Sequence, residues 1–511
     1  MLLRLKQFQK LLILILIPIF MAACESDDED EINSSSFSVV LSSKNTIPQV
    51  SAEGNGSATL TLNNDSGVLS GSITASGLTG AITAAHIHHA IAGSTGGIVV
   101  TLSQDSSNAD QFNIPSGTTL STSEQSALLN SEYYINVHTA ANASGEVRGQ
   151  IVATNQEVIR VELNGDNQIP TAVTTSNSGV AYITVNKSTR EIRGNITNTG
   201  LDNATAIHIH DAFAGTNGSV VTGLTINTDV SVWDIDVNTI LDSSQLSTLL
   251  AGGMYFNVHS SAFPNGEIRG QIIPEGIEHK RVKLNGDNQV PDAVSSAGSA
   301  IAYITVNKTS GGLTAHILTE GLTDTTAAHI HSGFAGSNGG LTLALTQDVD
   351  DFSTTTGDSL DSTALADLFA GKLYFNVHTD ANPNGELRGQ IEAGDIKVTR
   401  DVLDGSQSVP SVSTSATGIG YTTVDESNGT ITANVRTSGV VATAAHIHEG
   451  ATGNTGGIVL TLAQDGTDTD LWAANGSLDS TQLDAYKSSE LYFNIHSDAH
   501  APGEIRAQIN H

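Results

Sequence analysis

A His-Ile-His triplet that recurs four times constrains the fold of this chain more than any other feature. The triplet begins at residues 86, 208, 329 and 446, at intervals of 122, 121 and 117 residues. This period is far longer than the roughly 20–50 residues of solenoid repeats, so each unit needs its own hydrophobic core, as a small domain does. The sequence therefore predicts four tandem domains.

The predicted domains fill nearly the whole chain after residue 36. Short linkers near 154–157, 275–278 and 394–397 are expected to join them. We expect unit 1 to span residues 37–153, unit 2 158–274, unit 3 279–393 and unit 4 398–511.

Two further motifs recur once in each unit, as the triplet does. The first is an Asn-Val-His or Asn-Ile-His stretch, which ends at His138, His259, His378 and His496. The second is a Gly-Glu-x-Arg turn and strand, which begins at Gly145, Gly266, Gly385 and Gly503. Because all three motifs recur in the same order, each unit is expected to place them in the same geometry.

Each unit begins with the pattern of a β-hairpin. In unit 1, residues 57–62 and 69–75 alternate polar and apolar side chains around a turn at 63–67, as half-buried strands do. Unit 2 repeats the pattern at 181–185 and 191–196. The 50 glycines and the low charged fraction of 14% are typical of exported β-domains and unlike helical bundles.

One short helix interrupts the β pattern of each unit. Asp242 with Gln245, and Asp479 with Gln482, have the spacing of a capping box, whereas unit 3 has Asp361 but Ala364 in place of the glutamine. The predicted fold class is therefore all-β, with four tandem antiparallel β-sandwich or barrel domains that each contain one short helix.

Strand parity gathers polar residues on one outer face of each unit. Alternate side chains of a strand share a face, so His86 and His88 point away from the core if Ile87 points into it. A Gly-rich loop at 92–97 is expected to cover this face. The three histidines per unit are His86, His88, His138, His208, His210, His259, His329, His331, His378, His446, His448 and His496. The predicted polar network on the same face contains Asn136, Glu146, Arg148, Asn257, Glu267, Arg269, Asn376, Glu386, Arg388, Asn494, Glu504 and Arg506.

The order of these motifs resembles the CHRD domain, first described in chordin. Unit 3 carries the fullest version, at residues 328–331 and 375–391, and the resemblance extends over nearly everything after residue 37. Unit 1 departs at Ala143-Ser144 and unit 4 at Pro502 and Ala507, all in or beside one turn. The resemblance implies an immunoglobulin-like β-barrel with distant similarity to copper/zinc superoxide dismutases, and it implies little about activity.

Three interpretations of the polar face follow from the residues. The favoured one is a hydrogen-bonded network in which the side chains satisfy one another beneath the loop. The second is a Zn²⁺ or Cu²⁺ site made by three histidines with one open position. The repeated arginine would repel such an ion unless the repeated glutamate neutralises it. The third, a dismutase-like redox enzyme, lacks a fourth copper ligand, an aspartate zinc ligand and a disulfide.

The N-terminus has the pattern of a bacterial lipoprotein signal. Arg4, Lys6 and Lys10 precede an apolar core at 11–20, and residues 21–24 resemble a lipobox. We expect residues 1–23 to be removed and Cys24, the only cysteine, to carry the lipid. Residues 24–36 are acidic and serine-rich and are expected to form a disordered spacer. The expected location is the bacterial cell envelope, at the outer membrane or the cell surface.

Charge and repetition set the expected function. A formal net charge of −32 makes nucleic acid a poor partner. Tandem modules on a lipid-tethered stalk increase avidity, and no hydrolase triad, nucleotide loop or paired-carboxylate cleft recurs. We therefore expect no enzyme, and a surface lipoprotein that presents four modules to an envelope or extracellular protein or glycan. Apart from the membrane contact through lipid, no other partner is predicted, and no cofactor is expected besides the alternative of Zn²⁺ or Cu²⁺.

Overall fold

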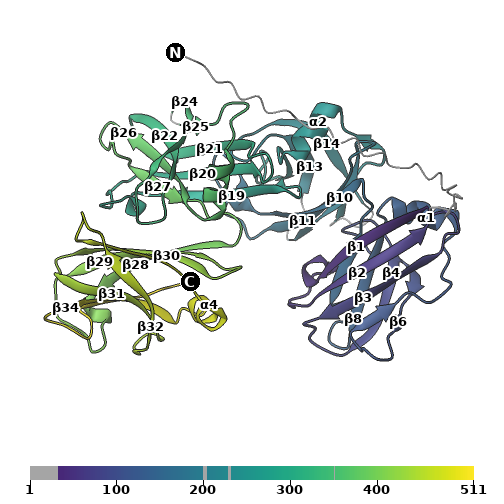
Figure 1. The fold of residues 1–511 in the computed structure, drawn as a ribbon. Helices are drawn as coiled ribbons and strands as arrows, with labels where there is room; N and C mark the ends of the chain where they lie inside the picture. Colours follow the sequence, from purple (N-terminus) through teal and green to yellow (C-terminus); the bar gives the residue numbers. More distant parts are fainter. Residues whose placement is uncertain (1–32, 200–203, 228–231, 350) are drawn as a thin grey trace, which may run out of the picture.

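The computed structural model describes residues 33–199, 204–227, 232–349 and 351–511. Four β-rich units follow one another along the described chain, each with one α-helix (Figure 1). The predicted all-β fold class is confirmed. The predicted signal segment and Cys24 lie outside the described residues. Within the described ranges, no helix is both long enough and apolar enough to span a membrane.

The four units share one order of elements. Unit 1 contains β1 (Ser34–Ser42), β2 (Asn55–Asn63), β3 (Leu69–Ser76), β4 (Ile82–His89), β5 (Ile98–Thr101), β6 (Ser103–Gln104), β7 (Gln111–Asn113), α1 (Thr122–Leu129), β8 (Tyr133–Thr139) and β9 (Val147–Ile151). Unit 2 contains β10 (Gln156–Leu163), β11 (Ser178–Asn186), β12 (Glu191–Thr199), β13 (Ala204–Asp211), β14 (Ser219–Ile226), β15 (Val232–Ile235), β16 (Thr239–Ile240), α2 (Ser243–Leu250), β17 (Met254–Ser260) and β18 (Ile268–Ile272). Unit 3 contains β19 (Ile277–Leu284), β20 (Ser299–Asn307), β21 (Leu313–Glu320), β22 (Thr325–Ser332), β23 (Gly340–Ala344), β24 (Thr346–Asp348), β25 (Asp351–Ser353), α3 (Ser362–Phe369), β26 (Leu373–Thr379) and β27 (Leu387–Gln390). Unit 4 contains β28 (Ile396–Asp404), β29 (Thr417–Asp425), β30 (Thr430–Ser438), β31 (Ala442–Glu449), β32 (Ile458–Gln464), β33 (Leu471–Ser477), α4 (Ser480–Lys487), β34 (Leu491–Ser497) and β35 (Ile505–Gln508).

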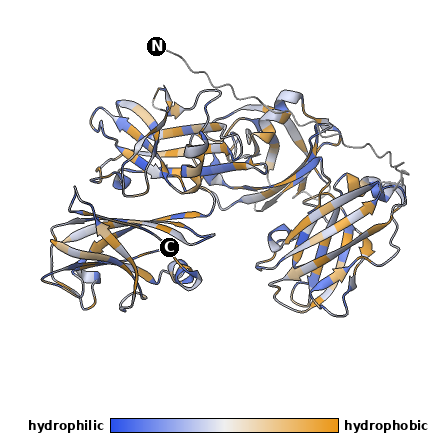
Figure 2. Ribbon diagram, in the orientation of Figure 1, coloured by the Kyte–Doolittle hydropathy of each residue, from blue (hydrophilic) through white to orange (hydrophobic). Residues whose placement is uncertain are grey.

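Antiparallel pairing joins the strands into one continuous sheet in units 1, 2 and 4 and into two sheets, β19-β20-β21-β25-β24 and β23-β22-β26-β27, in unit 3. In unit 4 the sheet closes into a barrel in the order β28-β29-β30-β33-β32-β31-β34-β35. Unit 1 has the corresponding order, β5-β4-β8-β9-β1-β2-β3-β7-β6, with β5 and β6 at its two ends. Figure 2 shows apolar and polar residues interleaved along the strands. The apolar side chains form a separate buried core in each unit, as the repeat length predicts.

The predicted first hairpin is confirmed, but the first strand starts earlier than expected. Residues 34–36, assigned from sequence to the disordered spacer, belong to β1 and pair with residues 61–63 of β2. That part of the prediction is wrong because the ladder uses backbone groups that every residue carries, whatever its side chain. The strands β10, β19 and β28 likewise begin two residues before the expected unit starts, which shortens the linkers.

The helix caps follow the sequence pattern. Asp242 and Asp479 form complete capping boxes with Gln245 and Gln482, and Asp361 caps α3 without a reciprocal partner. Unit 1 also has a complete box, made by Ser121 and Glu124. The sequence analysis overlooked it, although its Ser-x-x-Glu spacing is the standard signal.

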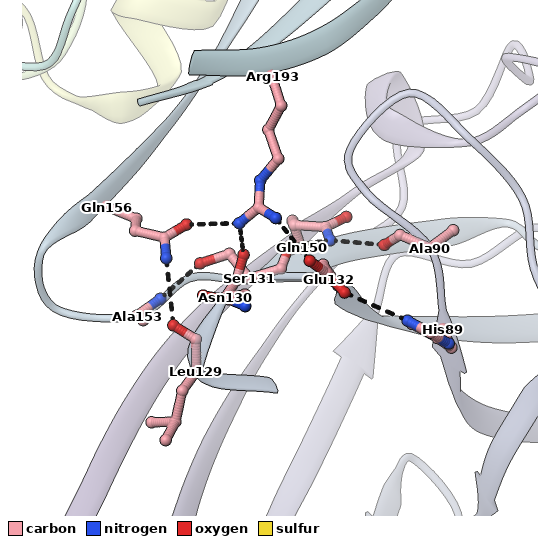
Figure 3. Close-up of polar contacts among 10 residues, drawn as sticks. All are labelled: His89, Ala90, Leu129, Asn130, Ser131, Glu132, Gln150, Ala153, Gln156 and Arg193. Atoms are coloured by element: carbon pink, nitrogen blue, oxygen red, sulfur yellow. Dashed lines mark hydrogen bonds and ion pairs between the residues drawn. The ribbon is translucent and has the colours of Figure 1, made fainter. Parts of the chain in front are cut away.

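The junction between units 1 and 2 is held by polar contacts. Figure 3 shows Arg193 of β12 reaching unit 1, where it bonds Glu132 and the carbonyl of Asn130. Gln156, the first residue of β10, donates a 3.1 Å hydrogen bond to the carbonyl of Leu129. Because these contacts begin at the first residue of the next strand, unit 2 docks directly against unit 1.

A second contact recurs at all three junctions. An Ala-Gly pair in the Gly-rich loop of one unit, at 92–93, 214–215 or 335–336, packs against a tyrosine of the next unit, Tyr182, Tyr303 or Tyr421. Units 1 and 4 each lack one partner of this contact. Unit 1 has the exposed Thr59 where the other units have the tyrosine, and unit 4 has Thr452-Gly453 in its loop. The residues at these positions thus differ between the surfaces that form the three junctions and the equivalent surfaces of units 1 and 4 that form none of them.

Candidate metal centre

Three histidines come together in every unit. They are His86, His88 and His138; His208, His210 and His259; His329, His331 and His378; and His446, His448 and His496. Within each group, the candidate ligand nitrogens all lie within 4.8 Å of one another. The structure therefore brings together all twelve histidines that the repeat singled out. The other five histidines of the sequence, His89, His279, His316, His500 and His511, belong to none of these groups.

The pairing of β4 with β8 creates the group in unit 1. His86 lies opposite Asn136, and Ala84 opposite His138, with a register shift between residues 82 and 84. Nδ1 of His86 consequently lies 3.2 Å from Nε2 of His138. Nδ1 of His138 is 3.0 Å from the carbonyl of Ala143. Because a carbonyl only accepts, this nitrogen holds the proton and Nε2 of neutral His138 presents its lone pair.

The second histidine of each triplet has an unused ring nitrogen. Nδ1 of His88 donates to the carbonyl of Gly96, 2.9 Å away, so its Nε2 also presents a lone pair. That Nε2 is buried and has no hydrogen-bond partner in the described part of the chain. The same is true of Nε2 in His210, His331 and His448. A buried polar atom without a partner costs about 1–3 kcal/mol, and here the cost recurs four times.

Burial favours the neutral form of both histidines of the His-Ile-His triplet. Burial lowers the pKa of His86 below its ordinary value of 6.5, and repulsion from His138 and His88 lowers it further. Burial also lowers the pKa of His88, which outweighs the opposite effect of the hydrogen bond to Gly96. Neutral imidazole is the form that binds a metal ion.

A tyrosine that the sequence analysis overlooked separates the histidines from the arginine. The ring of Tyr134 stacks on His88 with centroids 4.9 Å apart, and the guanidinium carbon of Arg148 lies 3.5 Å from the centroid of the same ring. Because β8 lies between β4 and β9, the ring stands between the two side chains. Tyr255, Tyr374 and Tyr492 make the same stacks in the other units.

The tyrosine and the arginine also hold the Gly-rich loop. The hydroxyl of Tyr134 accepts a hydrogen bond from the Gly96 amide, 3.3 Å away. Burial lowers the pKa of Arg148 to about 10, which leaves it charged at neutral pH. Parity placed Tyr134 on the outer face with His138, so the signal was present in the sequence.

The prediction that the glutamate and the arginine of each unit belong to one network on the outer face is wrong for the glutamate. Glu146 is fully buried and accepts hydrogen bonds from Thr79, Thr139 and Asn142, and no ion pair joins it to Arg148 within the described residues. The glutamate precedes β9, where strand parity does not yet apply, and so turns to the end of the barrel. Glu267, Glu386 and Glu504 bond loop hydroxyl groups in the same way. The glutamates therefore fasten loops and are not available to neutralise an ion.

The asparagine and glutamine of the predicted network bond the backbone. Asn136 donates to the carbonyl of Ser144, and Gln150 donates to the carbonyls of Ala90 and Ser131. Asn136 also explains the glycine of the Gly-Glu-x-Arg motif. Gly145 has φ of 125°, and a Cβ at that position would lie 2.2 Å from Oδ1 of Asn136. The polar network thus fixes the loops and leaves the histidine nitrogens converging on one another.

We predict that acid weakens unit 4 through Glu504. Hydrogen bonds from Ser497 and Thr414 lower the pKa of this carboxyl below 4.5, despite the opposing effect of burial. A folded-state pKa below the unfolded one gives stability that is complete above about pH 4.5 and is lost as the pH falls through the folded value. Glu504→Gln should lower the unfolding free energy of unit 4 by about 1–3 kcal/mol at pH 7. It should also reduce the loss of stability that the unit shows as the pH falls.

Urea unfolding followed by Trp472 fluorescence measures this effect. Trp472 is the only tryptophan of unit 4, and Trp233→Phe removes the other one in the chain. Glu490→Gln, at an exposed site of the same unit, is the control and should change neither quantity. Equal pH profiles for Glu504→Gln and the unsubstituted chain would contradict the prediction.

Comparison with protein families gives one result. The CHRD domain family matches four stretches of the chain, at residues 37–151, 159–272, 281–391 and 400–509. No curated protein matches the chain. The four stretches correspond to the four β-rich units and contain all four histidine groups. The chain therefore belongs to the CHRD domain family and is a modular protein with four copies of the domain in tandem.

Proposed function

We propose that each unit binds one Zn²⁺ or Cu²⁺ ion through its three histidines, so that one chain carries up to four ions. The observation that carries the proposal is the buried, unpartnered Nε2 of His88, His210, His331 and His448. In each unit this histidine is one of three whose candidate ligand nitrogens lie within 4.8 Å of one another. Coordination to a cation gives the orphaned lone pair a partner.

The residues fit such an ion in number and chemistry. Three neutral imidazoles with one open position are an established ligand set for Zn²⁺, and imidazole also suits copper. Nitrogens bound at about 2 Å to one ion lie at most about 4 Å apart, so small ring rotations are enough to close the site.

The backbone supports the same assignment. The carbonyls of Gly96 and Ala143 hold the protons of His88 and His138 on Nδ1, which is the usual supporting contact for metal-binding histidines. His86 binds through Nδ1, and its proton then moves to Nε2. The imidazoles bind and orient the ion, and the tyrosine ring keeps the arginine charge off the site. We assign the chain a non-catalytic role.

The location and further partners are part of the same proposal. The lipobox-like residues 21–24 support a lipid anchor at Cys24 in the bacterial envelope. The tandem arrangement supports presentation of the units at the outer membrane or cell surface to an extracellular protein or glycan, because repeated modules increase avidity.

Metal stoichiometry of the full chain tests the proposal. We expect the chelator-stripped protein, after incubation with excess Zn²⁺ or Cu²⁺ and gel filtration, to retain four ions by elemental analysis. His331→Phe should reduce the number to three, since only unit 3 is changed. His89→Asn, outside the four groups, should leave it at four. Retention of no ions, or loss of an ion in His89→Asn but not in His331→Phe, would refute it.

A further inference from the structure

A cleft of about 530 Å³ lies where unit 3 meets unit 4. Unit 3 contributes residues of β19 and β27 and the Ala335-Gly336 pair of its loop. Unit 4 contributes residues of β28 and Tyr421 of β29. The volume is within the range of about 300–1,000 Å³ that small-molecule sites occupy, and it depends on both units.

The lining of this cleft is strongly basic in an acidic protein. Five of the 21 lysines and arginines of the chain line it, against one carboxylate, Glu392. The five are Lys280, Arg281, Lys283, Arg388 and Arg400. With 53 acidic residues in the sequence, a random patch of this protein would be negative, so the local charge is opposite to that of the whole.

Only one of the five cations, Lys280, has an ion pair within the described residues. Lys280 pairs with Glu278, and Arg388 is held by loop carbonyls, but Arg281, Lys283 and Arg400 have no carboxylate partner. Nε of Arg281, Nε of Arg400 and the hydroxyl of Tyr421 are buried and have no hydrogen-bond partner. All three can donate a hydrogen bond, and an anion with several oxygens would satisfy them together.

The chain provides its own comparison for this cleft. The corresponding cleft between units 1 and 2 measures about 210 Å³ and has two cations, Arg148 and Arg160. A short 3-10 helix follows the first strand of each unit, at Ser43–Asn45 in unit 1 and Gly286–Asn288 in unit 3. The residues five and three positions before it are Ser38 and Val40 in unit 1, and Arg281 and Lys283 in unit 3. The cleft between units 2 and 3 has the acidic Glu162 at the second of these positions, and its two arginines are Arg269 and Arg281, the latter shared with the cleft between units 3 and 4. The basic lining is therefore specific to the last junction.

We propose that the cleft between units 3 and 4 binds a small organic or inorganic polyanion through sulfate, phosphate or carboxylate groups. The arginine forks match such groups in a bidentate manner. No histidine of the four groups lines the cleft, and the negative charge elsewhere on the chain directs anions to this one place. Binding weakens as salt is added, because the cations lie near the surface.

Calorimetric titration of the full chain with defined anions tests the site. The probes are a sulfated heparin disaccharide, inorganic phosphate and succinate, with maltose as the neutral control. We expect at least one anion to bind with a stoichiometry of one and maltose not to bind, and the anion that binds identifies the group recognised. Binding by none of the three anions would overturn the proposal.

Matched variants locate the binding. Arg281→Ser and Lys283→Val introduce the residues that unit 1 has at the same positions, and unit 4 has Val402 at the second. Each should weaken binding at least about tenfold, as expected for a charge-assisted hydrogen bond. Arg160→Ser, which changes the arginine of the first cleft that corresponds to Arg400, should have no effect. An equal loss of anion affinity in Arg160→Ser, or no loss of affinity in Lys283→Val, would also overturn the proposal.

Discussion

Replacing His448 with phenylalanine is expected to abolish the stabilisation of unit 4 by zinc. A ligand that binds only the folded state stabilises it by about 4 kcal/mol at a thousand times its dissociation constant. Phenylalanine keeps a ring in the stack on Tyr492 but removes the buried Nε2 that has no other partner. The measured quantity is the difference in unfolding free energy of unit 4 between zinc and chelator, from urea titrations followed by Trp472 fluorescence in a Trp233→Phe background.

The design separates metal binding from a structural role of the histidine. His448→Phe also loses the hydrogen bond to the carbonyl of Gly456, which lowers stability equally with and without zinc and cancels in the difference. His500→Asn, in the turn between β34 and β35 and outside the histidine group, should keep the full zinc effect. A zinc effect in His448→Phe as large as in the parent chain would exclude this histidine as a ligand.

The fold and the histidine groups were both predictable because they depend on periodicity. A repeat of about 120 residues implies separate cores, and a period of two implies which side chains share a face. These two rules placed Ile87 in the core and His86, His88 and His138 together. The CHRD resemblance added the barrel, which strand pattern alone does not distinguish from a sandwich.

The errors came from places where periodicity does not hold. Glu146 stands just before its strand, so parity did not apply to it. Its hydroxyl partners are Thr139, at the end of β8, and Thr79, in a loop whose position only the tertiary structure gives. Sequence reasoning also favoured a network in which the polar side chains satisfy one another. The structure instead pairs most of them with backbone carbonyls, which no side-chain pattern reports, and leaves Nε2 of His88 without a partner.

The contacts between units could not be predicted from the sequence of one unit alone. His316 looked like an isolated histidine, yet its place opposite Tyr303 is that of Asn195 opposite Tyr182 and of Asn434 opposite Tyr421. Asn195 and Asn434 bond the loop of the preceding unit. The residue differences between units therefore report which neighbour each unit has, and not only drift between copies.

Gly336→Ala is expected to undock unit 4 from unit 3. A Cβ at Gly336 would lie 2.6 Å from Cδ2 of Tyr421 and 3.0 Å from Cβ of Asn434, and crowding of this kind costs about 1–3 kcal/mol. Small-angle scattering should show a larger radius of gyration, and hydrogen exchange should rise in β29 and in the loop around Gly336. Because Gly336 also lines the basic cleft, anion binding should weaken in the same variant.

Gly453→Ala separates the crowding from backbone strain. Gly453 occupies the same loop position in unit 4 with the same φ of 81°, and a Cβ there has no neighbour within 4 Å. Both variants therefore bear the same penalty for a left-handed residue, and only Gly336→Ala adds the clash with the next unit. If the two variants expand the chain equally, strain and not docking explains the change. If only Gly336→Ala does so, the Ala-Gly and tyrosine pair is the contact that holds the units in line.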